Sequence, residues 1–151
     1  GRFVGASSKP IAEYNIKRGE ASGTHWKSST IEQMKHILFD ANYWKSFIHS
    51  RLNVAFGDAG SLTFFGNDQS EHRMMAENLV AEYPVRVTNN NTGRTVDEWK
   101  HKASRPDNHF LDCLVGSAVA ASVMGAALPV QGDHLEIPVR KRRRRRRVSY
   151  S

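Results

Sequence analysis

Two aspartates adjoin elements that place them where a functional site is expected. Asp40 directly follows a predicted strand, residues 34–39, and precedes a predicted helix. It therefore stands at the carboxyl end of a strand, the edge of an α/β sheet where ligands bind. Asp112 lies in the first turn of a long helix predicted over residues 108–127. If that helix packs over the sheet, the two carboxylates meet, and such oxygens bind Mg²⁺ or Mn²⁺, of which a pair promotes phosphodiester cleavage.

Each aspartate also has a simpler interpretation. Asp40 can serve as the N-cap of the helix that follows it, a role that Asn42 could also fill. Asp112 can complement the positive end of its own helix dipole. Considered singly, each acid favours the simpler role, whereas the pair at one sheet edge favours a metal site.

The apolar spacing predicts the elements that hold these acids. Trp44, Ile48 and Leu52 fall on one face of an amphipathic helix after Asp40. Strands and helices alternate, which indicates an α/β fold with a mixed sheet flanked by helices. We expect further strands at residues 2–7, 61–65, 85–88 and 95–100, a helix after residues 68–70 that buries Met74, Met75, Leu79 and Val80, and a loop or irregular hairpin over residues 8–29.

The long helix over residues 108–127 is apolar on nearly every side, which is typical of a buried helix. Cys113 is therefore expected to be an inert, buried thiol. Asp112 is the only charged residue between positions 110 and 127. A carboxylate buried there without a partner costs several kcal/mol, so it needs an ion pair, a cap or a metal.

The positive charge is concentrated at the end of the sequence. The formal net charge is +7, and eight cations are consecutive, so the rest of the chain carries −1. Such a run is typically disordered and binds polyanions without sequence specificity. The chain thus divides into a domain over residues 1–128 and an Arg-rich tail over residues 129–151, with the cations Arg140, Lys141, Arg142, Arg143, Arg144, Arg145, Arg146 and Arg147.

Several function classes are disfavoured. The single cysteine excludes an internal disulfide, and the histidines have no zinc-ligand spacing. The sequence has no Walker A motif, no Gly-rich dinucleotide loop and no G-x-S-x-G elbow. No run of 18 apolar residues predicts a membrane span, so no membrane partner is expected.

Four stretches, taken in order, resemble the C-terminal nuclease domain of phage terminase large subunits of the GpA type. The most specific is the last, in which a Trp-Lys pair precedes Asn-His-x-x-Asp-Cys and a small-residue helix. The resemblance covers about residues 2–126. The stretches are Asp40-Ala-Asn-Tyr-Trp-Lys45, Met75-Ala-Glu77, Glu98-Trp99-Lys100 and Asp107-Asn-His-Phe-Leu-Asp112-Cys113.

The resemblance implies an RNase H-like fold and Mg²⁺- or Mn²⁺-dependent cutting of concatemeric double-stranded DNA during genome packaging. Family members use three acids, on the first strand, a later strand and the C-terminal helix. Carried over, Asp40 is the later-strand acid, Asp112 the helix acid and Asp107 a weaker substitute for the third. The family's first strand and packaging ATPase have no counterpart here, so residues 1–128 are expected to form a partial nuclease domain.

The resemblance also implies partners. Lys45, Lys100 and Lys102, together with the Arg-rich tail, are expected to hold the DNA backbone, and His109 to line the site. A small terminase subunit and a portal protein would be the protein partners, in the cytoplasm of the bacterial host. The alternative is a non-catalytic α/β interaction module that its basic tail tethers to nucleic acid.

Overall fold

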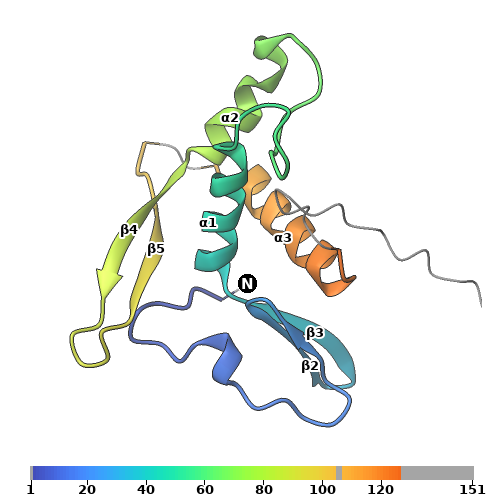
Figure 1. Cartoon of the computed structure of the whole chain (residues 1–151), viewed down its shortest axis with the longest axis vertical. Helices are drawn as coiled ribbons and strands as arrows, with labels where there is room; N and C mark the ends of the chain where they lie inside the picture. Colours follow the sequence, from blue (N-terminus) through green and yellow to red (C-terminus); the bar gives the residue numbers. More distant parts are fainter. Residues whose placement is uncertain (1, 105–106, 127–151) are drawn as a thin grey trace, which may run out of the picture.

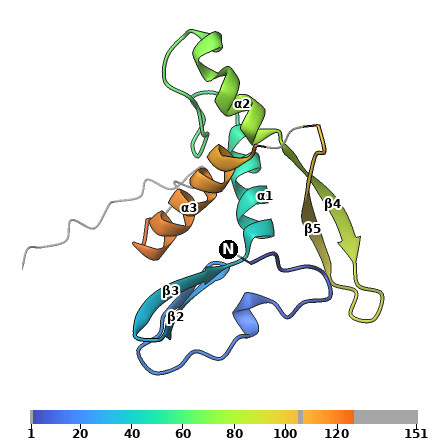
Figure 2. The same ribbon diagram turned by 180° about the vertical axis from the view of Figure 1, so that it is seen from behind.

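A computed structural model describes residues 2–104 and 107–126. Helix α1 (Ala41–Leu52) is central, with the hairpin of β4 (Glu82–Thr88) and β5 (Thr95–His101) on one side and α3 (His109–Val123) on the other (Figures 1 and 2). The hairpin of β2 (Trp26–Ile31) and β3 (Met34–Phe39) lies at the N-terminal end of α1, and α2 (Arg73–Leu79) lies at the opposite end. The chain is therefore α/β, as predicted, and is compatible with an RNase H-like nuclease fold.

The strands form two small antiparallel sheets, where the sequence predicted one mixed sheet. The first contains β1 (Ser22–Gly23), β2 and β3, and the second contains β4 and β5. A parallel pairing occurs at an isolated bridge between Arg2 and Asp40. The predicted strand over residues 2–7 is wrong, because only Arg2 of that segment makes a strand-like pairing.

The turn between β2 and β3 explains why the sequence did not predict the strand β2. Its turn is Glu32–Gln33, and both residues have positive φ, 49° and 65°. Positive φ at both central positions is typical of a two-residue turn that usually carries Asn or Gly. Without either residue type the sequence has no turn signal, although β3 itself spans the predicted residues 34–39.

The predicted strand at residues 61–65 is also wrong, since this segment is irregular. A short apolar run forms a strand only where another strand pairs with it, and none does so in the described part of the chain. The predicted helix after residues 68–70 is confirmed as the short helix η2 (Gln69–His72) followed by α2. Leu79 is buried as predicted, whereas Met74 and Val80 are exposed.

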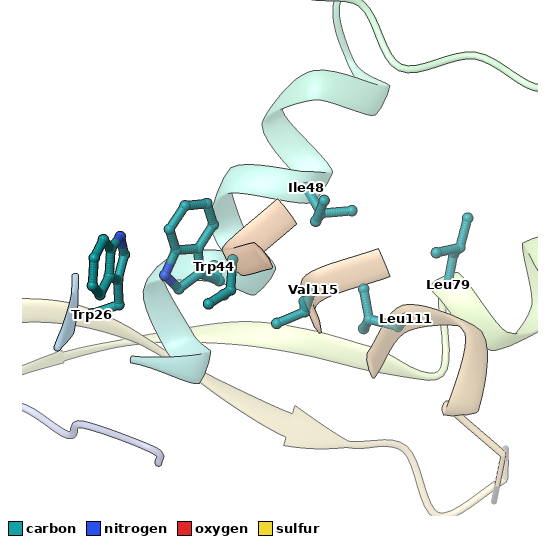
Figure 3. Close-up of a cluster of buried hydrophobic side chains, with 7 residues drawn as sticks. Trp26, Trp44, Ile48, Leu79, Leu111 and Val115 are labelled. Carbon is teal, nitrogen blue, oxygen red and sulfur yellow. The ribbon is translucent and has the colours of Figure 1, made fainter. Parts of the chain in front are cut away.

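The core lies between α1, α3, α2 and β2 (Figure 3). Helix α3 contributes one stripe to it, Leu111, Val115 and Val119, at a spacing of four residues. The prediction that this helix is buried on every side is therefore wrong, and Cys113 is exposed. Leu114 and Ala118 are half-buried beside this stripe, whereas Val123, on the last turn of the helix, is exposed. In the described ranges, no helix has the length and apolar content needed to cross a bilayer.

Candidate functional site

Lys45 lies inside the protein. It occupies the second turn of α1, on the same face as Ala41 and Ile48, and its side chain is only 2% exposed. Removing an ammonium group from water is costly unless carboxylates pair with it and hydrogen bonds satisfy it. The partners of Lys45 therefore define the polar centre of this domain.

The first partner of Lys45 is Glu82, the first residue of β4. The ammonium donates to Glu82 Oε1 over 2.5 Å, and the Glu82 side chain is 4% exposed. The same oxygen accepts a hydrogen bond from Asn108 Nδ2. Asn108 stands at the N-cap position of α3, but its side chain does not cap that helix and instead binds Glu82. A buried ion pair thus connects α1, β4 and the start of α3.

The second partner of Lys45 is Asp112. Its Oδ1 lies 3.2 Å from Lys45 Nζ, and its side chain is 56% exposed. The apolar composition of α3 had suggested that Asp112 is enclosed in the core, but the side chain is largely open to solvent. It lies in the first turn of α3, which the structure fixes through Leu111, completely buried, and through the bond from Phe110 N to Asn78 Oδ1. Its carboxylate is open to solvent on a fixed helix turn.

Asp40 is the N-cap of α1, as its position predicted. Its Oδ1 accepts hydrogen bonds from the backbone N–H groups of Asn42 and Tyr43 at 3.1 and 3.3 Å. Its Oδ2 lies 3.8 Å from His25 Nδ1, and the residue is buried. Burial raises the pKa of Asp40 above its ordinary value, although the two backbone bonds and nearby His25 oppose that rise.

The two aspartates have different surroundings. Asp40 lies where α1 meets the β2–β3 hairpin, since its backbone N–H donates to His25 O. Asp112 lies where α3 meets α2 and β4, because Asn78 and Glu82 bind the same end of that helix. Asp112 thus shares its partner, the Lys45 ammonium, with Glu82 and not with Asp40. Within residues 2–104 and 107–126, no group of three or more His, Cys, Asp or Glu side chains has metal-binding geometry.

The remaining predicted residues are scattered. Asp107 and His109 are exposed beside the start of α3, and Lys102 is half-buried after β5. Lys100 is exposed and pairs with Glu98 at 3.2 Å. The prediction that Lys45 holds the DNA backbone is wrong, because its ammonium is buried and bound to two carboxylates and cannot reach a DNA phosphate. The basic run, residues 140–147, lies outside the described residues.

The N-terminal segment closes the other side of the Lys45 ammonium. The ring centroid of Phe3 lies 5.0 Å from Lys45 Nζ, within the range of a cation–π contact. Arg94 of the β4–β5 turn holds this segment, because its guanidinium donates to the carbonyl oxygens of Gly5 and Ser8. Glu98 adds a bond from the backbone N–H of Ala6.

Glu82 and Asn108 were not singled out from the sequence. The sequence feature that could have led to them is the position of Lys45, which lies four residues after Ala41 and three before Ile48, on the apolar face of its helix. A lysine on such a face requires a buried acid elsewhere in the chain. Nothing local identifies which acid, because Glu82 is 37 positions away.

The donors present suit a hard divalent cation at Asp112 better than at Asp40. Mg²⁺ commonly binds through one or two carboxylates and retains several waters. The Asp112 carboxylate is more than half exposed, and one of its oxygens is paired with the Lys45 ammonium. Asp40 is buried, and one of its oxygens already accepts two backbone bonds.

Comparison with known proteins gives one family. The family model described as the endonuclease domain of the terminase large subunit gpA matches residues 4–134, most of the chain. No curated protein and no solved structure matches. The chain therefore belongs to the family of terminase large-subunit gpA endonuclease domains.

Proposed function

We propose that this chain cuts concatemeric double-stranded phage DNA during genome packaging and that Asp112 binds the divalent cation for this reaction. The family match supports an endonuclease. The observation that carries the assignment of Asp112 is its geometry: an exposed carboxylate anchored through Oδ1 to the buried ammonium of Lys45. A surface aspartate without such an anchor would have no fixed orientation.

The chemistry follows that of nucleases with two metal ions. Mg²⁺ or Mn²⁺ ions, when bound, would supply an activated water and neutralise the charge on the leaving oxygen. Asp112 would contribute a ligand oxygen, and Lys45 would fix its orientation. Asp40 and Asp107 are the further acids that the family resemblance proposes. Asp40 would have to contribute through Oδ2, because Oδ1 caps α1.

Binding of DNA is proposed to depend on Lys100 and Lys102, at the end of β5, and on the basic run over residues 140–147. Contacts of this kind recognise the phosphate backbone and carry no sequence information. Their contribution to affinity falls steeply as the salt concentration rises. The small terminase subunit and the portal protein are the proposed protein partners, in the cytoplasm of the bacterial host.

The proposed function is tested by nicking of supercoiled plasmid in Mn²⁺, with the terminase large subunit that carries this domain. Asp112→Asn is expected to abolish nicking, and Asp58→Asn, in an exposed turn, should leave it unchanged. Asp107→Asn examines the weaker third acid in the same assay. Full nicking by the Asp112→Asn protein would contradict the proposal.

A second measurement separates cutting from attachment. Deletion of residues 140–147 is expected to weaken DNA binding at moderate salt and to leave metal-dependent nicking at low salt. If the chain were instead a non-catalytic module held on nucleic acid by its tail, the deletion would remove all binding. In that case Asp112→Asn would have no effect on any readout.

A further inference from the structure

We infer that Lys45, neutralised by Glu82, is a positioning residue that holds the Asp112 carboxylate in the orientation that binds a divalent cation. This inference rests on the proposed function of Asp112. It assigns Lys45, Glu82 and Asn108 to support of the site, where the sequence had assigned Lys45 to DNA.

The two carboxylate oxygens of Asp112 have different surroundings. Oδ1 lies 3.2 Å from the Lys45 ammonium. Among the described residues Oδ2 makes no ion pair or hydrogen bond, and the side chain is 56% exposed. One oxygen is thus anchored while the other faces solvent, where a hydrated cation can approach. Metal-ligating carboxylates are commonly hydrogen-bonded in this way by residues behind them.

The charges of the cluster are arranged to keep it attractive to cations. Lys45 alone would place a positive charge directly behind Asp112 and repel a metal ion. Glu82, 2.5 Å from the same ammonium, cancels that charge. Asn108 is uncharged and adds a hydrogen bond to Glu82. The cluster therefore carries one net negative charge, which belongs to the exposed Asp112.

The anchor is also rigid. The Lys45 side chain is 2% exposed, and the ring of Phe3 covers its ammonium. The ammonium is attached to α1, and its partners come from β4 and α3, so it cannot move without breaking contacts to both. An exposed pair such as Arg73–Glu77, in which the Arg73 side chain is 81% exposed, has no comparable constraint.

The experiment measures Mn²⁺ binding by electron paramagnetic resonance to the terminase large subunit without nucleotide. The relevant Mn²⁺ site is identified as the one that the wild-type protein has and the Asp112→Asn protein lacks. Lys45→Met/Glu82→Gln removes one positive and one negative charge together, and the new side-chain amide keeps an oxygen for Asn108. We expect Mn²⁺ at that site to bind about 10-fold more weakly, the lower end of the effect usual for residues behind metal ligands. Nicking by this variant should recover as the Mn²⁺ concentration is raised.

A second variant keeps the inference testable if the double variant does not fold. Glu82→Gln alone leaves the Lys45 charge uncancelled behind Asp112, and it too should weaken Mn²⁺ binding. Glu98→Gln is the matched control, because it removes the acid of another lysine–glutamate pair, with Lys100, and should leave the Mn²⁺ affinity unchanged. Thermal denaturation of each variant reports whether it folds.

The outcomes separate the two proposals. If the wild-type protein and Asp112→Asn bind Mn²⁺ equally, the proposed metal-binding role of Asp112 fails. If Asp112→Asn loses a site but the folded Lys45→Met/Glu82→Gln and Glu82→Gln proteins bind Mn²⁺ as tightly as wild type, the role of Asp112 stands and the positioning inference is overturned.

Discussion

The ammonium of Lys45 lies 3.2 Å from Oδ1 of Asp112 and joins a buried residue of α1 to an exposed residue of α3. The stronger interaction of Lys45 is with Glu82, because both of those groups are buried and the second carboxylate is not. Because Lys45 and Glu82 are both buried, neither can lose the other without a large cost in stability. Solvent weakens the Lys45–Asp112 pair and leaves the Asp112 carboxylate available.

Lys45→Met is expected to lower the free energy of unfolding by about 3–5 kcal/mol, because it leaves the Glu82 carboxylate buried without its cation. Lys45→Met/Glu82→Gln should recover much of that loss, since no uncompensated charge remains. Denaturation in urea measures both proteins. Equal destabilisation of the single and double variants would show that the ion pair is not the source of the effect.

Asp40→Ala should reduce the free energy of unfolding by about 1 kcal/mol, since it removes the N-cap of α1. Asp40→Asn should retain stability, because Asn is an equally good cap. The asparagine variant therefore tests the role carried over from the family without disturbing the helix. Loss of Mn²⁺-dependent nicking in Asp40→Asn would support a ligand role, and normal nicking would leave Asp40 as a cap alone.

Acid should destabilise the protein through His49. Burial lowers the pKa of His49 below its ordinary value, where it packs 4.5 Å from the Trp99 ring. Between the folded pKa and about 6.5, the unfolded chain therefore binds more protons than the folded one, and stability falls as the pH falls through that window. Asp40, with its raised pKa, contributes with the opposite sign.

His49→Gln should flatten the fall in stability below about pH 6.5, because glutamine does not titrate. Midpoints of thermal unfolding between pH 7.5 and 5 measure the slope. His36→Gln, at an exposed position of β3, controls for the loss of a histidine as such. An unchanged slope in His49→Gln would show that another group governs the acid response.

Arg94→Ala is expected to destabilise the chain by about 2 kcal/mol, because it removes hydrogen bonds from a charged group to the carbonyls of Gly5 and Ser8. Cleavage of the N-terminal segment by protease should accelerate as well. Arg86→Ala is the control: its 3.9 Å pair with Asp97 is exposed, and its loss should change stability by less than about 0.5 kcal/mol. Similar effects of the two variants would argue against the fastening role of Arg94.

Local patterns predicted the elements that depend on short-range interactions. The cap at Asp40, the amphipathic spacing from Trp44 and the strands over residues 34–39, 85–88 and 95–100 were each predicted from residues within or next to the element itself. The strand at residues 61–65 failed because its expected pairing required a partner from elsewhere in the chain.

The sequence by itself determined the α/β class, the start of α1 and the motif order by which the family was recognised. Only the tertiary structure decided that Lys45 is buried, that Glu82 is its partner and that Asp112 is exposed. A helix with apolar residues all round does not reveal which side its neighbours cover. Likewise, a buried lysine finds its acid through packing between residues far apart in the chain, a relationship that no local spacing records.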